Sequence, residues 1–548
     1  MTTDHRPFYL PFLLLALLLI TSLPLFLCMP PIDDGVLFDL HTREILKGEV
    51  PYRGVLETNP PAMLWILAGT RWLLGDSSIA LRAVDLAIFT AIVLLALAVL
   101  KQSGISRRER AWSAVVCYFY YFSLSEWCHC QRDMWLLAPS LALVWLRGRQ
   151  IQRLNSGSSS RGLLVGHAMV EGLVLGAGMW LKPMLLVPAG VTWLVGVFGT
   201  RSWRSVGLDF LGAVLGVAMA GAGGVIWLVA TGAWPYFLET YLSWNPHYVA
   251  AGRQHWTLAR FLGTVVRLFP WYLLHVPAAA LAVVAVGKTP VRGRGAEPHS
   301  EPAGQLGELP VALLAGFYVG WLIQAFLLQH LFDYVQAPGV LLALLICLAV
   351  VWRKGTARRV LAALLIVLVF VAVACSPAFR GSRLACWWPC LRDGSTPEIR
   401  DRLKLLSLPD WQDLDRVADY LREQQVADSE LLCFTNSTIH LYWELGIRPA
   451  TRYVYLENNL VFFSERTEQL ASEIAAAGPR YVVSDLMAAG VPRESLDSIR
   501  QGARLRPAAG DERGPILPWS HPIVFRAGRY AVHRVQGPTG WPTLTVVE

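Results

Sequence analysis

Long runs of apolar residues fill most of the first 376 positions of the chain. A helix needs roughly 17–25 apolar residues to cross the hydrocarbon core of a bilayer, and in lipid its backbone must satisfy its own hydrogen bonds. Eight runs approach that length, at 8–28, 79–100, 162–181, 207–230, 262–286, 310–330, 336–352 and 358–376. Three shorter or more polar runs lie at 111–126, 134–147 and 183–199. The sequence therefore predicts a polytopic α-helical membrane protein with about eleven transmembrane helices.

Composition and charge agree with this class. Only 16% of the 548 residues are charged, whereas soluble domains carry about 25% charged residues. A soluble multidomain chain and a disordered chain are both excluded. The net charge of +8 could indicate a nucleic-acid partner, but the lysines and arginines gather in every second loop between the runs. That pattern marks cytoplasmic loops, and we expect no nucleic-acid partner.

The same pattern predicts how the chain lies in the membrane. We expect the protein in the cell membrane, either inner or plasma membrane, with its N-terminus in the cytoplasm. An odd number of spans places the C-terminus on the opposite, outer side. The first run is too long for the apolar part of a signal peptide, and no small-x-small site follows it. We therefore expect an uncleaved anchor.

The chain changes character after residue 376. Helical periodicity is present at 410–425 and 465–478, and the segments 430–436 and 480–485 have the composition of buried strands. This alternation predicts an extracytoplasmic α/β domain over 377–548, following a transmembrane domain over 1–376. The Gly-, Pro- and Arg-rich segment 288–308 is predicted to be a flexible cytoplasmic linker.

The cysteines give weaker information. Cys386 and Cys390 have a spacing that allows a disulfide but does not establish one. Cys128, His129 and Cys130 contain metal-binding atoms, but no second ligand cluster accompanies them in the sequence. We interpret these cysteines as structural and predict no metal site from them.

The first outer loop, 29–78, is too long and polar to be a simple connector. Asp33 and Asp34 come directly after the first run, at the expected depth of the outer membrane surface. Glu57 lies just before Pro60-Pro61, where a second short helix is expected to begin. Carboxylates held at this depth are candidates for proton transfer.

Between these acidic sites, the segment 36–43 has apolar and polar residues in a helical pattern. We expect a short helix lying in the membrane interface. Gly48 is a natural end for this helix.

This loop resembles a known family. A carboxylate pair after the first span, the sequence PYR at 51–53, an acidic residue and a double proline are the pattern of polyprenyl-phosphate-sugar-dependent glycosyltransferases. These are GT-C-fold membrane enzymes similar to protein O-mannosyltransferases and to the aminoarabinose transferases of lipid A. The resemblance covers residues 30–100 well. It continues more loosely through ALRAVD (80–85), QRDMWLL (131–137), WLKPMLLVP (180–188) and HLFDYVQAPGVLLALL (330–345). Many relatives have lysine directly before the double proline, where this chain has Asn59.

The resemblance implies transfer of a sugar from a polyprenyl phosphate to an acceptor hydroxyl at the outer face, with inversion. The acceptor could be a lipid, a glycan or a protein. Asp33 corresponds to the catalytic carboxylate, Asp34 to its acidic neighbour and Glu57 to a second acidic site. Asp34 could instead be only a helix N-cap. The three carboxylates could also hold a divalent cation, and GT-C enzymes differ on this, so no cofactor is assigned.

Cations and polar side chains near the outer ends of the spans are candidates for binding the donor phosphate. They are Lys182, Arg53, Arg132, Arg43, Arg82, His330 and Tyr334. Each has a simpler alternative: Lys182 could extend to the lipid interface, Arg132 could pair with Asp133, and Tyr334 could be an interface anchor. Arg43 and Arg82 could simply flank helices.

A transporter or lipid flippase is the competing interpretation. Such proteins often have inverted repeats and interrupted helices near the membrane midplane. This sequence shows neither clearly, and its polar cluster lies at the outer surface. An enzyme is therefore favoured.

Overall fold

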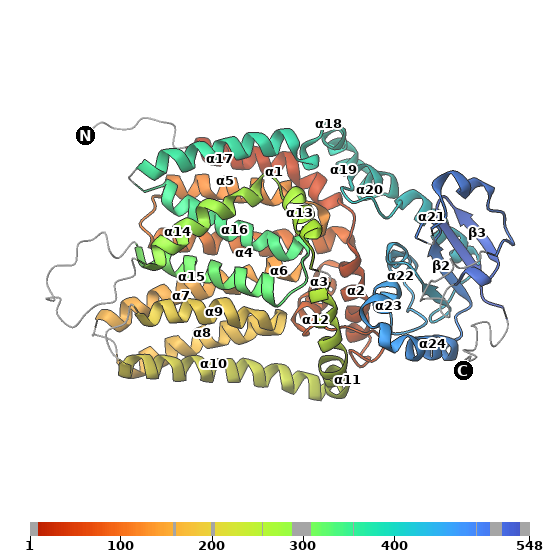
Figure 1. Cartoon of the computed structure of the whole chain (residues 1–548), viewed down its shortest axis with the longest axis horizontal. Coiled ribbons are helices and arrows are strands. Elements are labelled where there is room, and N and C mark those ends of the chain that lie inside the picture. The colour runs from red at the N-terminus through yellow and green to blue at the C-terminus, as the bar shows by residue number, and fades with distance from the viewer. Residues whose placement is uncertain are drawn as a thin grey trace.

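The computed structural model describes residues 9–536, apart from 157–159, 199–202, 255, 288–307, 354–355, 489 and 505–517. Long helices lie side by side in one bundle, and a smaller C-terminal part with a β-sheet covers one end of it (Figure 1). Within these residues, seven helices are long and apolar enough to cross a membrane, and a bent pair makes up to eight. The seven are α1 (Leu10–Cys28), α4 (Ser78–Gln102), α8 (Arg161–Leu181), α10 (Trp203–Ala230), α15 (Glu308–Leu327), α16 (Asp333–Val351) and α17 (Thr356–Cys375).

The predicted span 262–286 is not one straight helix. It is divided into α13 (Leu258–Arg267) and α14 (His275–Gly287), and the segment Trp271–Gly287 that contains α14 is bent by 103° from α13. Pro270 lies in the break, and proline can neither donate a helical hydrogen bond nor continue a helix without a clash. Helix α13 therefore lies at the end of the bundle that faces the C-terminal part (Figure 1).

The three shorter or more polar predicted runs are helices as well. They are α5 (Arg107–Ser123), α7 (Leu137–Ser156) and α9 (Leu186–Phe198), and they lie along the long helices in the bundle (Figure 1). None of the three has both the length and the hydropathy that define a candidate span. Short elements complete the bundle, namely α6 (Arg132–Trp135), α11 (Trp234–Glu239), α12 (Asn245–Gln254) and the turns at Glu126–Cys128, Pro183–Leu185, Thr240–Trp244, Trp271–Leu274 and Pro377–Phe379.

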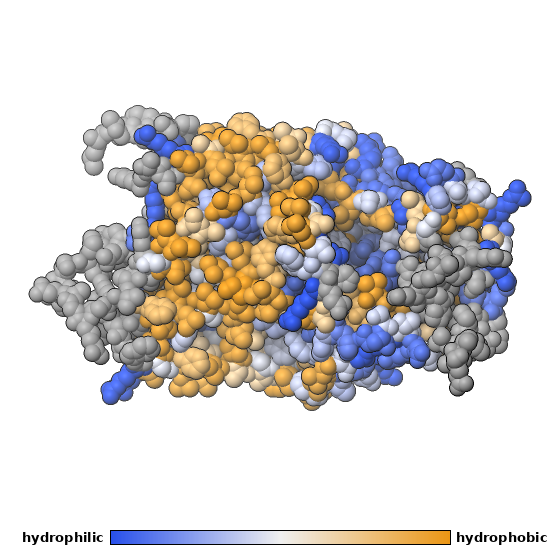
Figure 2. All heavy atoms as spheres, viewed as in Figure 1, coloured by the Kyte–Doolittle hydropathy of each residue, from blue (hydrophilic) through white to orange (hydrophobic). Residues whose placement is uncertain are grey.

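The surface supports a multi-pass membrane protein. Hydrophobic side chains cover the flank of the helix bundle, while hydrophilic ones gather over the C-terminal part (Figure 2). Many exposed apolar side chains belong to lipid-length helices, as Leu13 on α1, Met219 on α10 and Phe370 on α17 illustrate. In water such surface would be costly, and in a bilayer it is the expected surface of a span.

The first outer loop contains two helices, α2 (Asp33–Leu46) and α3 (Ala62–Leu74). The expected helix at 36–43 is therefore longer, and its apolar face packs against protein. Its apolar residues Leu37 and Leu40 are buried in a core shared with Leu414 and Tyr442 of the C-terminal part. This packing removes the apolar face of α2 from water. Gly48 follows the helix with a φ of 74°, as expected for a residue that ends a helix.

The C-terminal part combines helices with a mixed sheet. The described residues contain four strands in the order β1-β2-β4-β3, with β1 parallel to β2 and the other neighbours antiparallel. The strands are β1 (Leu431–Cys433), β2 (Tyr481–Asp485), β3 (Ile523–Ala527) and β4 (Tyr530–Arg534). The helices are α18 (Gly381–Leu384), α19 (Trp387–Asp393), α20 (Pro397–Leu403), α21 (Trp411–Glu423), α22 (His440–Leu445), α23 (Leu456–Phe462) and α24 (Thr467–Ala477), with turns at Asn436–Thr438, Ser464–Arg466, Arg493–Ser498 and Pro518–Ser520.

Both predicted helices and both predicted strands of this part are present, as α21, α24, β1 and β2. The hairpin of β3 and β4 was not predicted. The linker predicted at 288–308 lies outside the described residues except for its last position. All nine cysteines fall within the described residues, and Cys386 and Cys390 are free, buried thiols without a disulfide.

Hydrogen bonds fasten the C-terminal part to the end of the bundle that carries α2. The amide of Leu56 donates to the carbonyl of Arg452 at 2.8 Å. Oε1 of Glu126 accepts the amides of Leu405 and Leu406 at 2.7 and 2.8 Å. The first outer loop is therefore enclosed between the helix bundle and the C-terminal part.

Candidate functional site

Asp33 and Asp34 are the first two residues of α2, after Ile32 in an extended conformation. A helix N-terminus favours negative charge because its free N–H groups and its dipole point there. Asp34 is not the N-cap, because Ile32 occupies that position and no side chain caps this end. Instead, Oδ2 of Asp34 accepts from Gln131 Nε2 at 2.9 Å, and Oδ1 accepts from the Tyr455 hydroxyl at 3.0 Å. Two other elements thus hold this carboxylate in a fixed orientation.

Asp33 contacts a histidine of the C-terminal part. Oδ1 of Asp33 lies 2.8 Å from Nε2 of His440, the first residue of α22. The His440 ring packs edge-on against Trp411, with 4.7 Å between the ring centroids. The side chain of His440 is 1% exposed and that of Asp33 is 26% exposed. Asp33 is therefore oriented from one side and still accessible from the other.

Glu57 is almost fully buried, with 2% of its surface exposed. Oε1 accepts the backbone amide of Asn59 at 2.8 Å and also the Asn59 side-chain amide. No group among the described residues hydrogen-bonds Oε2. Asn59 thus orients the second acidic site. One oxygen of Glu57 stays available.

Burial changes the acidity of two of the three carboxyl groups. It raises the pKa of Asp34, while the hydrogen bond from Gln131 and the positive charge of Arg132 oppose the rise. It also raises the pKa of Glu57, again against the charge of Arg132. The two groups therefore take up protons at a higher pH than exposed carboxylates do.

A cavity of about 580 Å³, counting the solvent at its mouth, has Arg132 in its wall, whose charge acts on Asp34 and Glu57. None of the three carboxylates is among its lining residues. Four of the predicted phosphate-binding residues line it, namely Arg132, Lys182, His330 and Tyr334. Asn59 lines the cavity too, so the loop that carries Glu57 forms part of the wall. Nε2 of His330 lies 2.9 Å from the carbonyl oxygen of Tyr248, another wall residue.

The two cations of this cavity are in different states. Lys182 Nζ donates to both oxygens of Asp133, at 2.7 and 2.9 Å. Asp133 therefore pairs with Lys182, and not with its neighbour Arg132 as the simpler interpretation suggested. Arg132 packs over the Phe38 ring, 5.1 Å from its centroid. Within the part of the chain that the structure describes, its buried Nε and Nη1 atoms have no hydrogen-bond partner.

The pair of Lys182 and Asp133 makes a testable contribution to stability. Both side chains are largely buried, with 11% and 1% exposed. Removing one partner of a buried ion pair leaves the other charge uncompensated and costs about 3–5 kcal/mol. We expect Lys182→Met to lower the free energy of unfolding by this amount, measured by thermal unfolding in detergent. Lys182→Met combined with Asp133→Asn should recover most of the loss. A single variant as stable as the wild type would contradict this.

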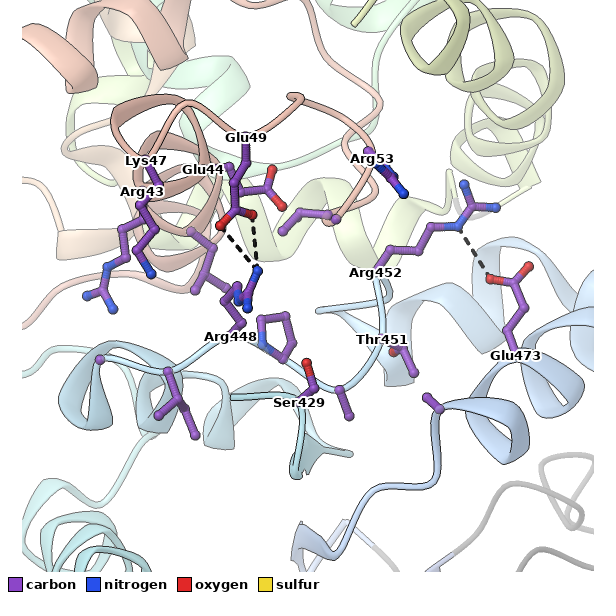
Figure 3. A pocket seen from close by; sticks show the side chains of 18 of the residues that line it. Arg43, Glu44, Lys47, Glu49, Arg53, Ser429, Arg448, Thr451, Arg452 and Glu473 are labelled. Carbon is purple, nitrogen blue, oxygen red and sulfur yellow. Dashed lines mark hydrogen bonds and ion pairs between the residues drawn. The ribbon is translucent and has the colours of Figure 1, made fainter. Parts of the chain in front are cut away.

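The other three predicted cations lie elsewhere. Arg43 and Arg53 line a second cavity, of about 1310 Å³, between the first outer loop and the C-terminal part (Figure 3). There Arg43 pairs with Asp39 and donates to the carbonyl oxygens of Tyr442 and Trp443. Figure 3 shows other arginines of this cavity engaged by acidic side chains, with Arg448 on Glu49 and Arg452 on Glu473. The structure does not bring these arginines to the cavity of Arg132.

Arg82 is buried within α4, with 1% of its surface exposed. Its guanidinium donates to the carbonyl of Pro30 and packs over the Phe26 ring. It therefore fixes the chain immediately before Asp33 and does not line either cavity.

Three residues of the site have no counterpart among the predicted ones. Gln131, His440 and Tyr455 contact the two aspartates. Gln131 lies in the segment QRDMWLL, whose resemblance to the family could have indicated it. His440 and Tyr455 belong to the C-terminal part, which has no motif of its own. Only the packing of that part on the loop reveals them.

The carboxylates do not form a metal cage. Across the described ranges, no group of three or more His, Cys, Asp and Glu side chains is arranged to hold a metal ion. The groups nearest to Asp34 are an amide and a hydroxyl that donate hydrogen bonds to it. His129 contacts the carbonyl oxygen of Tyr121 through Nε2. The donor set therefore fits hydrogen-bonded carboxylates, and no chemical step is assigned to a metal.

Comparison with known proteins identifies the fold of this chain. Neither protein-family models nor curated protein sequences match this chain. Among solved structures, ArnT from Cupriavidus metallidurans bound to undecaprenyl phosphate matches with a TM-score of 0.53 and 13% identity, over 97% of this chain and 99% of that one. The apo structure of the same protein matches with a TM-score of 0.45 and 13% identity, over 97% and 99% of the two chains. The Archaeoglobus fulgidus oligosaccharyltransferase matches with a TM-score of 0.43 and 11% identity, over 87% of this chain and 69% of that one. On the strength of the first match, this chain shares the GT-C fold of ArnT, the fold that its first outer loop predicted.

Proposed function

We propose that this chain is a membrane glycosyltransferase that moves a sugar from a polyprenyl-phosphate donor to an acceptor hydroxyl at the outer face of the membrane. One observation carries the proposal: the guanidinium of Arg132, with two buried nitrogens that have no hydrogen-bond partner among the described residues, lines a cavity and acts by its charge on Asp34 and Glu57. Arg132 is thus available to an anion from outside the protein. The undecaprenyl phosphate bound to ArnT in the matched structure supports a lipid phosphate as that anion.

In this proposal the chain crosses the membrane eleven times, by the eight candidate spans together with α5, α7 and α9. The N-terminus lies in the cytoplasm and the C-terminal domain, 377–548, lies outside the inner or plasma membrane. The alternation of basic loops supports this orientation. It places the three carboxylates at the outer surface, where a lipid-linked donor presents its phosphate.

The donor phosphate would lie against Arg132, with Lys182, His330 and Tyr334 around it. When the bond between the anomeric carbon and the phosphate oxygen breaks, the electron pair stays on the phosphate. A fixed cation stabilises the negative charge that develops there. The cavity thus supplies what this leaving group needs, which is a positive charge more than a proton donor.

Asp33 would act as the general base. The acceptor oxygen forms its bond to the anomeric carbon while its proton passes to Asp33, and one displacement inverts the anomeric configuration. A carboxylate that is oriented on one side and open on the other suits this role. His440 keeps Asp33 in place, while Asp34 and Glu57 position the acceptor or the base.

The raised pKa values predict how turnover depends on pH. Burial raises the pKa of both Asp34 and Glu57, so these groups lose their charge at a pH above the ordinary carboxyl range. We expect kcat/KM to fall as the pH is lowered, with the midpoint above about pH 4.3, where an unperturbed glutamate titrates. Profiles measured between about pH 4 and pH 8 should show the falling limb move to lower pH in Glu57→Gln. If kcat/KM of the wild type instead fell with a midpoint at the ordinary pKa of glutamate, about 4.3, the prediction would be wrong.

The predicted loss of kcat/KM at low pH can be distinguished from acid unfolding of the protein. A carboxyl group whose pKa is raised by folding stabilises the folded state in its protonated form, and this contribution is lost as pH rises through the raised pKa. Protonation of Asp34 and Glu57 therefore does not by itself unfold the protein. Thermal unfolding recorded at each pH is the control.

The function itself is tested with purified protein in lipid and a panel of polyprenyl-phosphate sugars. Release of free polyprenyl phosphate is measured for the wild type and for Asp33→Asn. We expect release with one donor class and its loss in the variant. Movement of intact donor between leaflets, without covalent change, would overturn the proposal in favour of a flippase.

A further inference from the structure

A short polar segment of the C-terminal part has side-chain atoms that bind no other described residue. The segment Thr435–His440 follows the carboxyl end of β1, which is parallel to β2. Thr435 is 2% exposed and Ser437 is 8% exposed. Four buried atoms here have no hydrogen-bond partner within the described chain: Thr435 Oγ1, Asn436 Oδ1, Ser437 Oγ and His440 Nδ1.

Such a concentration is unusual because each buried polar atom without a partner costs free energy. Most buried polar groups in proteins are hydrogen-bonded. The neighbouring Thr438 follows the rule, since its hydroxyl donates to the carbonyl of Thr435 at 2.7 Å. The segment is therefore not generally poor in hydrogen bonds. The unused capacity is confined to particular side chains.

One end of the segment contacts the candidate site, and the other binds a residue that is close in sequence to Tyr455. His440 contacts Asp33 through Nε2 at 2.8 Å. At the other end, the amide of Asn436 donates to Glu457 at 3.1 Å. Glu457 lies two positions after Tyr455, whose hydroxyl donates to Asp34. The segment therefore lies at the boundary where the C-terminal part meets the two aspartates.

The chemistry of these side chains selects a class of ligand. The two hydroxyls and the imidazole nitrogen can donate or accept, the Asn436 amide oxygen accepts, and none of the four carries a fixed charge. They suit neutral hydroxyl groups better than a phosphate, which the cation Arg132 suits. The near-complete burial favours the small group that is enclosed during transfer over an acceptor that arrives from outside.

We propose that Thr435, Asn436 and Ser437 bind hydroxyl groups of the sugar that is transferred, which makes this segment the determinant of sugar specificity. The inference rests on the proposed glycosyltransferase function and assigns the sugar-binding part of the same site. His440 then has two roles, orienting Asp33 through Nε2 and facing the sugar through Nδ1.

The first arm of the test measures stability and needs no substrate. Thr435→Val and Ser437→Ala remove buried polar atoms that lack partners, so each should raise Tm by about 1–2 °C. Thr438→Val is the matched control in the same segment, and it removes a hydroxyl that has a partner. It should lower Tm. A fall in Tm for Thr435→Val and Ser437→Ala as large as that for Thr438→Val would show that their hydroxyls serve the fold, and would overturn the inference.

The second arm pairs these variants with donors that lack one sugar hydroxyl. With the complete donor, kcat/KM should fall about tenfold in Thr435→Val or Ser437→Ala, the loss expected for one hydrogen bond in a buried site. With the monodeoxy donor that lacks the contacted hydroxyl, variant and wild type should have the same kcat/KM. Coupling of this kind identifies the interacting pair of groups.

The outcomes separate the two proposals. If the wild type turns over a donor but the variants lose the same factor with every deoxy donor, the residues act through the fold and the sugar assignment is wrong. Coupling to a deoxy acceptor in place of a deoxy donor would also overturn it. If the wild type transfers no sugar from any donor, the glycosyltransferase proposal itself fails.

Discussion

Arg132→Met is expected to weaken binding of polyprenyl phosphate at least about 100-fold and to lower kcat/KM by a similar factor. Hydrogen bonds to charged groups contribute about 1.5–3 kcal/mol each, and Nε and Nη1 of Arg132 are buried without a partner among the described residues. Two such bonds to a phosphate account for the factor. Binding of the released product, polyprenyl phosphate, is measured directly, so the result does not depend on knowing the acceptor.

Two further variants make this experiment specific. Arg53→Met removes the same charge from an exposed arginine of the second cavity, and we expect it to leave binding within about twofold of the wild type, as is usual for a surface change away from the ligand. Arg132→Lys keeps the charge felt by Asp34 and Glu57 but loses the planar fork of the guanidinium. It should recover part of the affinity. Equal losses in Arg53→Met and Arg132→Met would contradict the assignment of the phosphate to the smaller cavity.

Asp33→Asn is expected to lower turnover by about 1000-fold, within the range of general-base catalysis, while donor binding stays unchanged. Asparagine keeps an oxygen that can accept from His440, so the contact at 2.8 Å can persist. What is lost is the ability to take a proton. A burst or single-turnover measurement of polyprenyl phosphate release, beside a binding measurement on the same preparation, separates these effects.

Comparison of the acidic residues decides which one is the base. Glu57 also has an available oxygen, because no described group hydrogen-bonds its Oε2. If Asp33→Asn retained more than about a tenth of the activity, well above what loss of a general base leaves, Asp33 would not be the base. In that case Glu57→Gln should be the inactive variant. Loss of turnover in Asp33→Asn together with loss of donor binding would instead indicate a damaged site.

Much of the fold could be predicted from the sequence because lipid restricts the choices. A backbone in hydrocarbon must hydrogen-bond internally, so an apolar run such as 79–100 predicts a helix, and α4 (Ser78–Gln102) is there. The acidic loop could also be recognised, because Asp33, Asp34 and Glu57 stand at short, fixed distances from prolines along the chain. Local chemistry and chain order are enough for such features.

The position of each cation required the tertiary structure. Arg43, Arg53 and Arg132 have similar sequence contexts, at the outer ends of helices or in the outer loop. Folding directs the first two to a cavity that is rich in acidic partners and the third to one where Asp133 is already paired with Lys182. Which charges are compensated depends on neighbours that lie far away in the sequence.

The sequence by itself determined that the chain spans a membrane repeatedly and that carboxylates gather in its first outer loop, because both depend on the order of residues along the chain. The bend at Pro270, the burial of α2 and the contact of His440 with Asp33 were decided by the tertiary structure. His440 is 407 positions away from Asp33. No local pattern specifies such a contact, because it exists only when the apolar face of α2 has found its partner in the C-terminal part.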